Sequence, residues 1–191
     1  MLAEFSVFDT ASYSIEHLFD SEENENLILG FTAPNNAMGL ESYLKNVAAD
    51  DENANLARTY LVKDKQTGEL ACYFSLRTGL ITMQVADDAF DSIPAIELAN
   101  FAVNDEYRQK HTEARSIGRY SFEKFVLPIV RCMARYVGVN ALYIYALPND
   151  RLIGYYTLMG FSRLPEHQEK FVQMHVKPKY DEGCIFMYQR V

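Results

Sequence analysis

The fold is decided by residues 96–161, which contain IELANFAV at 96–103, RSIGR at 115–119, ALYIYAL at 141–147 and YTLMGF at 156–161. The first and third runs are apolar and indicate strands, and the apolar spacing after Arg119 indicates a long amphipathic helix between them. A strand, a helix and a second strand in this order form a crossover that places the strands side by side and parallel. The helix would begin at the carboxyl end of the first strand, where free N–H groups and the helix dipole can bind an anion. This stretch is therefore a candidate phosphate site.

The start of this helix resembles the phosphate loop of the GNAT acyltransferases, which use acetyl-CoA. The GNAT pattern is Gln/Arg-x-x-Gly-x-Gly/Ala; Arg115 and Gly118 match it, and Tyr120 departs from it. The segment before Arg115 is also longer than is usual in GNAT proteins. A second register, from Arg108, has the usual spacing from the strand but contains no glycine. We favour the Arg115 register because Gly118 stands directly before the helical periodicity. The alternative is an ordinary helix start without a ligand.

The end of the stretch resembles the last GNAT motif. In that motif an Asn precedes a Tyr by seven residues and Gly-Phe closes the helix; Asn149, Tyr156 and Gly160-Phe161 keep this spacing without a gap. The first strand also resembles its GNAT counterpart, which often ends in Ala-Val before a polar turn. The resemblance covers residues 96–161 in detail and the rest of the chain in element order only.

The resemblance implies an α/β fold, namely the GNAT acyl-CoA acyltransferase fold: a twisted, mixed, mostly antiparallel sheet flanked by helices, in one domain spanning residues 1–191. It implies acetyl-CoA as co-substrate and no metal. Strand backbone would pair with the pantetheine arm, and the helix start would bind the pyrophosphate. The residues implied for the cofactor are Phe101, Ala102, Val103, Arg115, Ser116, Ile117, Gly118, Arg119 and Asn149.

Two residues are candidates for the chemistry that the resemblance implies. Tyr156 would donate a proton to the departing CoA thiolate, although a tyrosine at helical spacing is more often a packing residue. Glu97 is the candidate base that deprotonates the amine. Strand alternation places it on the same face as Ala99, Phe101 and Val103. The alternative for Glu97 is a strand carboxylate that faces water or pairs with an arginine.

The composition limits the classes of protein to which this chain can belong. The 191 residues, with 49% hydrophobic and 23% charged, are ordinary for a globular domain. No apolar run is long enough for a membrane span, and residues 1–9 lack the pattern of a signal peptide. The three cysteines, Cys72, Cys132 and Cys184, follow no metal-ligand spacing and indicate free thiols. We therefore expect a cytoplasmic protein.

The net charge of −8 is unevenly distributed. The first sixty residues carry eleven acidic and two basic residues, a net charge of −9, whereas residues 108–135 carry seven basic and two acidic ones. An acidic wall would attract a cationic acceptor; its candidate residues are Glu16, Asp20, Glu22, Glu23, Glu25 and Glu41. The partners predicted from this distribution are a cationic small-molecule or peptide amine, with no nucleic acid and no membrane, and a homodimer stays open.

Outside residues 96–161 the local patterns predict a strand at 4–9, a short helix around Ile15, a helix at 39–49 and hairpin strands at 58–62 and 70–76. They also predict irregular structure at 21–26, 50–55 and 87–94, a long loop after Leu164 and a last strand at 184–188.

The function favoured by these features is an acetyl-CoA-dependent N-acetyltransferase acting on a primary amine. The alternative is a non-catalytic CoA-binding or protein-interaction module of the same fold. An aminoacyl-tRNA-modifying toxin, another GNAT activity, is a third alternative. We would expect it to have a broad basic surface, and the acidic first sixty residues argue against one.

Overall fold

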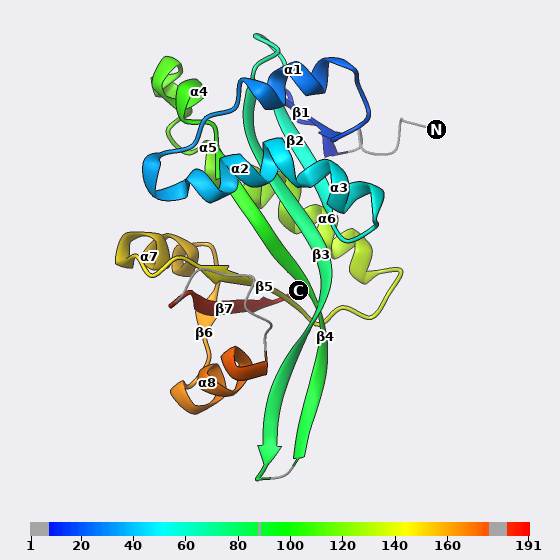
Figure 1. Cartoon of the computed structure of the whole chain (residues 1–191), viewed down its shortest axis with the longest axis vertical. Coiled ribbons are helices and arrows are strands. Elements are labelled where there is room, and N and C mark those ends of the chain that lie inside the picture. Colours follow the sequence, from blue (N-terminus) through cyan, green and yellow to red (C-terminus); the bar gives the residue numbers. More distant parts are fainter. Residues whose placement is uncertain (1–7, 88, 176–182) are drawn as a thin grey trace. The chain divides into compact units, whose positions relative to one another are not determined.

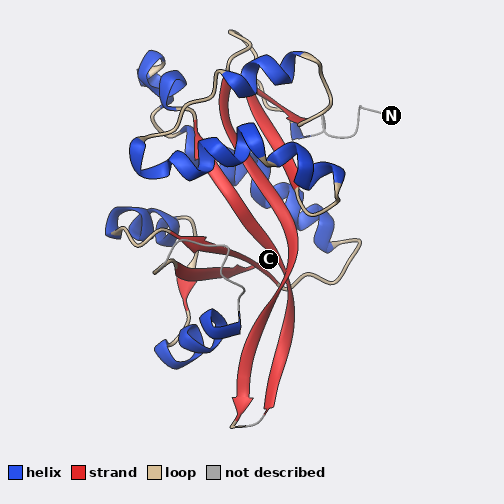
Figure 2. Cartoon of the chain, viewed as in Figure 1, coloured by secondary structure: helices blue, strands red, loops and turns tan. Residues whose placement is uncertain are grey.

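The computed structural model describes residues 8–87, 89–175 and 183–191 (Figure 1). Seven strands form one mixed sheet in the order β1-β2-β3-β4-β5-β7-β6. The chain divides into two compact units, which we call the first unit (Met1–Arg77 with Asn100–Ile129) and the second unit (Thr78–Ala99 with Val130–Val191). The strand and helix content agrees with the predicted α/β class (Figure 2).

The strands of the first unit include the predicted hairpin. β2 (Arg58–Asp64) pairs antiparallel with the beginning of β3 (Leu70–Ala86), and β1 (Tyr13–His17) pairs antiparallel with the other edge of β2. Gly68 lies in the turn between β2 and β3 with a φ of 74°, a conformation that favours glycine. The predicted hairpin is therefore confirmed.

Helices cover one face of these strands (Figures 1 and 2). They are α1 (Glu23–Leu29), α2 (Met38–Asn46) and α3 (Ala48–Asn53), with the 3₁₀ turn η2 (Asn35–Ala37) before α2. Their apolar side chains meet those of the strands in a buried cluster formed by Leu18, Phe31, Leu44, Ala48, Leu61, Leu70, Tyr73 and Ala102. This cluster is the core of the first unit on that face.

The N-terminal predictions were partly wrong. The strand predicted at residues 4–9 lies mostly outside the described residues. The short helix predicted around Ile15 is strand β1, because its backbone pairs with β2, Ile15 opposite Val62. The acidic segment 21–26 is not irregular but leads into helix α1, where Asn24 is fully buried and its amide nitrogen donates to the carbonyls of His17 and Leu18. One buried amide thus ties a charged helix to the core.

Two further predicted breaks are regular structure. Residues 50–53 are helical in α3, because Asp50 and Asp51 lie in its first turn, where acidic side chains interact favourably with the helix dipole. Residues 89–94 belong to β4 (Ala89–Val103), the neighbour of β3 in the sheet. The polar residues of this segment are tolerated because they lie on an exposed part of the strand.

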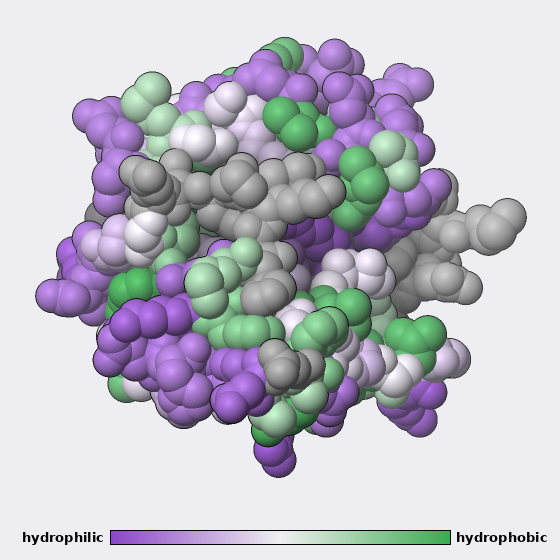
Figure 3. All heavy atoms as spheres, turned by 60° about the horizontal axis from the view of Figure 1, so that its bottom comes forward, coloured by the Kyte–Doolittle hydropathy of each residue, from purple (hydrophilic) through white to green (hydrophobic). Residues whose placement is uncertain are grey.

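The far end of β3 and the beginning of β4 expose apolar side chains. Leu80, Val85 and Phe90 have exposed fractions of 61%, 64% and 64%. Figure 3, in which the lower end of Figure 1 comes forward, shows hydrophobic side chains among hydrophilic ones on that face. On the other side, Ile81 and Ala95 are buried in the core of the second unit.

That core lies between strands and one helix. β5 (Ala141–Ala146) is parallel to β4 and antiparallel to β7 (Ile185–Arg190), which also pairs with β6 (Ser162–Arg163). Helix α8 (Glu166–His175) occupies part of the segment predicted as a long loop, because Val172 joins the apolar cluster. The cluster consists of Ile81, Ala95, Ala141, Tyr143, Leu164, Val172 and Phe186.

The predicted long helix is present but not uniform. α5 (Ile117–Ser121) continues through a π-helical segment, η4 (Phe122–Val126), into α6 (Leu127–Ala134). The π-helical segment directly precedes Pro128, which has no N–H to donate and so interrupts the α-helical ladder. The helix therefore contains wider turns shortly before the proline.

Candidate active site

The predicted cofactor strand ends at a buried asparagine in the first unit. The amide nitrogen of Asn104 donates to the Leu70 carbonyl at 2.8 Å, and its amide oxygen accepts from the Thr32 hydroxyl at 3.2 Å. The same oxygen accepts from the Glu106 N–H at 3.2 Å and so caps helix α4 (Asp105–Lys110). These bonds fix the backbone that directly follows Phe101, Ala102 and Val103.

The long segment before Arg115 is folded onto the first unit. α4 and the 3₁₀ turn η3 (Thr112–Ala114) occupy it, and the buried Tyr107 hydroxyl donates to Asp64 at 2.6 Å. Arg108 lies in the last turn of α4 and pairs with Asp105. The alternative register from Arg108 therefore does not open a helix, whereas Arg115 directly precedes the start of α5.

The Arg115 segment has the local form of an anion site. Ile117 and Gly118 are buried at the first turn of α5, while Arg115 and Ser116 are exposed. Ile117 packs in one cluster with Val103, so the predicted pantetheine strand and the predicted phosphate loop meet within the first unit. Arg119 pairs with Glu123 at 2.7 Å, whereas Arg115 has no acidic partner among the described residues. Arg115 is therefore the charge available to an anion.

The parallel ladder between β4 and β5 is short. Its three residue pairs run from Ala95 opposite Ala141 to Glu97 opposite Tyr143. β4 continues to Val103, but within the described residues its backbone beyond Glu97 is not paired with β5. A strand edge without a partner on one side is what an extended ligand such as a pantetheine arm would need. The last ladder pair carries the candidate base.

Glu97 is buried rather than solvent-facing, with an exposed fraction of 3%. The Tyr143 hydroxyl donates a hydrogen bond to its Oε2 at 2.9 Å. Of the alternatives for Glu97, a strand carboxylate that faces water is thus excluded by its burial.

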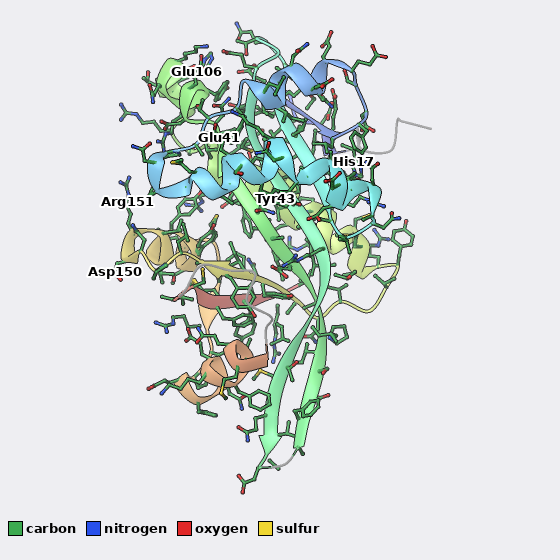
Figure 4. All side chains as sticks on the ribbon, in the orientation of Figure 1. His17, Glu41, Tyr43, Glu106, Asp150 and Arg151 are labelled. Carbon is green, nitrogen blue, oxygen red and sulfur yellow. The ribbon has the colours of Figure 1, made fainter. Side chains whose placement is uncertain are left out.

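Helix α7 (Asp150–Leu158) in the second unit carries the last motif. Asn149 is its N-cap, and the Asn149 side chain accepts a hydrogen bond from the Leu152 N–H at 3.1 Å. Asp150 and Arg151, labelled in Figure 4, follow in the first turn. Seven residues correspond to about two helical turns, so Asn149 and Tyr156 lie on the same side of α7.

Tyr156 is buried, with an exposed fraction of 5%, and its ring lies against Phe161 at a centroid distance of 5.7 Å. Gly160, with a φ of 95°, permits the turn that brings Phe161 back. Burial raises the pKa of the Tyr156 phenol above its usual value, so the hydroxyl is protonated at neutral pH. Among the described residues no group forms a hydrogen bond with this hydroxyl. A protonated, unpaired hydroxyl is suited to donate a proton to a ligand.

No group of three or more His, Cys, Asp or Glu side chains among the described residues could bind a metal ion. None of the helices in the described part of the chain is both long and apolar enough to cross a membrane.

Sequence reasoning missed three residues that the structure places beside the candidates: Asn104, Tyr143 and Gly79. Asn104 follows an apolar strand and precedes two acidic residues, which is an N-cap signal. Tyr143 could have been found only from the register of two strands, and Gly79 only from the contact of its backbone with Tyr143.

The chain has the GNAT fold, which confirms the predicted fold class. No family model matches its sequence. Among solved structures it is similar to a tyrosine-to-phenylalanine variant of KacT, with a TM-score of 0.67 and 17% identity over 94% of this chain and 95% of that one. AtaT complexed with acetyl-methionyl-tRNAfMet gives a TM-score of 0.62 and 16% identity, over 93% and 94% of the two chains. An AtaT variant bound to the C-terminus of the antitoxin AtaR and acetyl-CoA gives 0.60 and 16%, over 93% and 92%.

These structures correct the predicted partners. The expectation of a small-molecule or peptide amine with no nucleic acid was wrong: AtaT is solved with a tRNA, and the AtaT–AtaR complex is solved with DNA. The error lies in treating all of the acidic residues as unpaired negative charges. On α2, Glu41 (Figure 4) pairs with Lys45 at 2.7 Å, and on β1, Glu16 pairs with Lys63 at 2.5 Å. Two of the six residues of the predicted acidic wall are therefore neutralised locally.

The cations are distributed in the opposite way. Several exposed basic side chains after residue 108 have no acidic partner among the described residues; they include Arg115, Lys124, Arg131, Arg135 and Arg151. Net charge over the chain hides this difference, because it counts paired and unpaired groups alike. The affinity of a protein for a phosphate backbone depends on basic side chains that have no acidic partner, rather than on the net charge of the whole chain.

Proposed function

We propose that the chain is an acetyl-CoA-dependent N-acetyltransferase whose acceptor is the primary amine of an aminoacyl-tRNA. The observation that carries the proposal is the similarity of the fold to AtaT complexed with acetyl-methionyl-tRNAfMet over almost all of both chains. The complex of AtaT with acetyl-CoA supports the choice of acyl donor. A cytoplasmic location stays a prediction.

The candidate residues support this chemistry. The amine nitrogen attacks the thioester carbonyl carbon, a C–N bond forms, and the C–S bond breaks. Glu97 takes the proton that the nitrogen loses, and Tyr156 donates a proton to the departing thiolate, so the products are an amide and free CoA. The buried, protonated hydroxyl of Tyr156 supports its role as the acid.

The remaining candidates would bind acetyl-CoA. Backbone groups of Phe101, Ala102 and Val103 would pair with the pantetheine arm, and one N–H would polarise the carbonyl. Residues 115–119 would bind the pyrophosphate through backbone N–H groups and the Arg115 side chain. Asn149 would contact the pantetheine arm in addition to capping α7.

Radiolabelled acetyl-CoA and total tRNA charged with amino acids test the proposal. We expect label in the tRNA fraction, released by mild base as N-acetyl amino acids. Uncharged tRNA and free amino acids are the control acceptors, and neither should be labelled at the rate of charged tRNA. The Tyr156→Phe variant is the control enzyme, and it should label charged tRNA more slowly than the wild type.

Two results would overturn the proposal in different ways. Acetyl-CoA binding by calorimetry without any labelling would favour the non-catalytic CoA-binding module. Labelling of free amines in preference to charged tRNA would retain the enzyme and reject the tRNA acceptor.

A further inference from the structure

Glu97 and Tyr143 form a buried pair at the end of the β4–β5 ladder. They are directly opposite each other in the parallel register, and both are almost fully buried, at 3% and 6% exposure. Residues opposite each other point to the same side of the sheet. The bond from the Tyr143 hydroxyl to Glu97 is therefore built into the register of the two strands. A buried carboxylate requires such donors, because burying an unpaired charge is costly.

A glycine on a third strand gives the hydroxyl room. A Cβ at Gly79 of β3 would lie 2.1 Å from the Tyr143 hydroxyl oxygen and 2.8 Å from two carbon atoms of its ring. Any larger residue would force the ring to move. The ring is also in contact with Phe186, at a centroid distance of 5.5 Å, and with Tyr145, at 6.0 Å. The hydroxyl is thus held in place from several sides.

We infer that Tyr143 is a positioning residue that orients the Glu97 carboxylate for proton transfer, and that Gly79 is required for it to do so. The inference rests on the proposed function, in which Glu97 accepts the proton of the attacking amine. A carboxylate has two oxygens and about four lone-pair sites, so the bond from Tyr143 to Oε2 occupies only one of them. The terminal torsion of a glutamate is broad without a partner, and a general base must be aligned to act.

A measurement that needs no turnover tests the pair itself. In protein labelled with ¹³C at the glutamate carboxyl carbons, the Glu97 signal is identified by its absence from the Glu97→Gln variant. Removal of the Tyr143 donor deletes the hydrogen bond to Oε2, so at one fixed pH the Tyr143→Phe variant should shift this signal away from its wild-type position. The matched control is Tyr188→Phe. Tyr188 lies opposite Tyr143 in the β5–β7 ladder, and its hydroxyl makes no hydrogen bond within the described residues.

Kinetics then test the role. Loss of a hydrogen bond to a charged group should lower kcat in Tyr143→Phe by about ten- to a hundredfold, with the acetyl-CoA dissociation constant unchanged. In a Glu97→Gln background the same substitution should have little further effect, because both changes act through one carboxylate.

The Gly79→Ala variant tests the same contact in a second way, because it retains every polar group but displaces the Tyr143 ring. It should show the same loss of kcat as Tyr143→Phe. The inference is overturned if Tyr143→Phe and Tyr188→Phe have the same kcat and the same Glu97 ¹³C signal, or if Glu97→Gln retains wild-type kcat. An inactive wild type would contradict the proposed function instead, and the ¹³C signal of Glu97 would still decide whether Tyr143 contacts and orients the carboxylate.

Discussion

The Cys72 thiol donates a hydrogen bond to the Ser121 hydroxyl, with 3.0 Å between sulfur and oxygen, and so ties strand β3 to the last residue of helix α5. Both side chains are fully buried. The contact places the helix that starts at the candidate phosphate loop against the sheet of the first unit. The free cysteine predicted from the sequence is thus a packing residue.

We predict that Cys72 resists thiol reagents in the native protein. Burial raises the pKa of its thiol to about 12, so almost no reactive thiolate exists at pH 8. Peptide mapping after alkylation should find Cys132, which is partly exposed, modified first, and Cys72 modified only after denaturant is added. Equal rates for the two cysteines in native protein would contradict this packing.

We predict that Gly118→Asp abolishes stabilisation by acetyl-CoA. A ligand that binds only the folded state raises Tm with the logarithm of its concentration, and a carboxylate at the first turn of α5 would repel the phosphates. Gly138→Asp is the matched control, because a side chain there meets no atom within 4 Å. A thermal shift retained in Gly118→Asp would mean that the phosphates bind elsewhere, and no shift in the wild type would remove the site altogether.

We predict that Tyr156→Phe lowers kcat by about ten- to a thousandfold with little change in acetyl-CoA affinity, because only the proton donor is removed. The neighbouring Tyr155→Phe, made in the same helix, should have near wild-type kcat. Steady-state CoA release and calorimetry separate the two effects. If Tyr156→Phe turns over as fast as the wild type, its hydroxyl has no part in the chemistry.

The residues with strong local signals were the ones that sequence reasoning placed correctly. Asn149, Tyr156 and Gly160 stand close together in the chain, and the cap, the helix and the glycine turn each depend on a few neighbouring residues. The strands at 96–103 and 141–147 were also found from short apolar runs. Their predicted parallel pairing is confirmed, although only over three residue pairs.

What could not be predicted depends on distant contacts. Charged runs were interpreted as loops, yet α1 and α3 are helices because buried side chains such as Asn24 and Ala48 attach them to the core. The Tyr143 hydroxyl donates a hydrogen bond to Glu97, although the two residues are 46 positions apart in the sequence. No local pattern gives the register of two strands that far apart, so the partner of the candidate base could be found only in the structure.

We predict that Asn149→Ala destabilises the protein by about 1 kcal/mol, the usual cost of an N-cap side chain. For a chain of this size that corresponds to a fall in Tm of about 2–4 °C. Asn149→Asp, which keeps an acceptor for the Leu152 N–H, should remain close to the wild type. Equal melting temperatures for Asn149→Ala and the wild type would show that the cap contributes nothing to stability.

The last prediction concerns pH and the segment before the candidate phosphate loop. His111 Nε2 lies 2.6 Å from Oε2 of Glu69, and this carboxylate, with a smaller contribution from Glu113, raises the pKa of His111 above its usual value. A raised folded-state pKa means that folding favours the protonated imidazole. The stabilisation is complete below the unfolded-state pKa of about 6.5 and is lost as pH rises through the higher folded-state value. We therefore expect the Tm difference between wild type and His111→Gln to be largest near pH 6 and to shrink as pH rises.

Glu69→Gln should remove most of this pH dependence. Glu113→Gln, whose side chain is 77% exposed in the wild type, should remove little. A difference that stays constant between pH 6 and pH 9 would show that the ion pair does not contribute to folding.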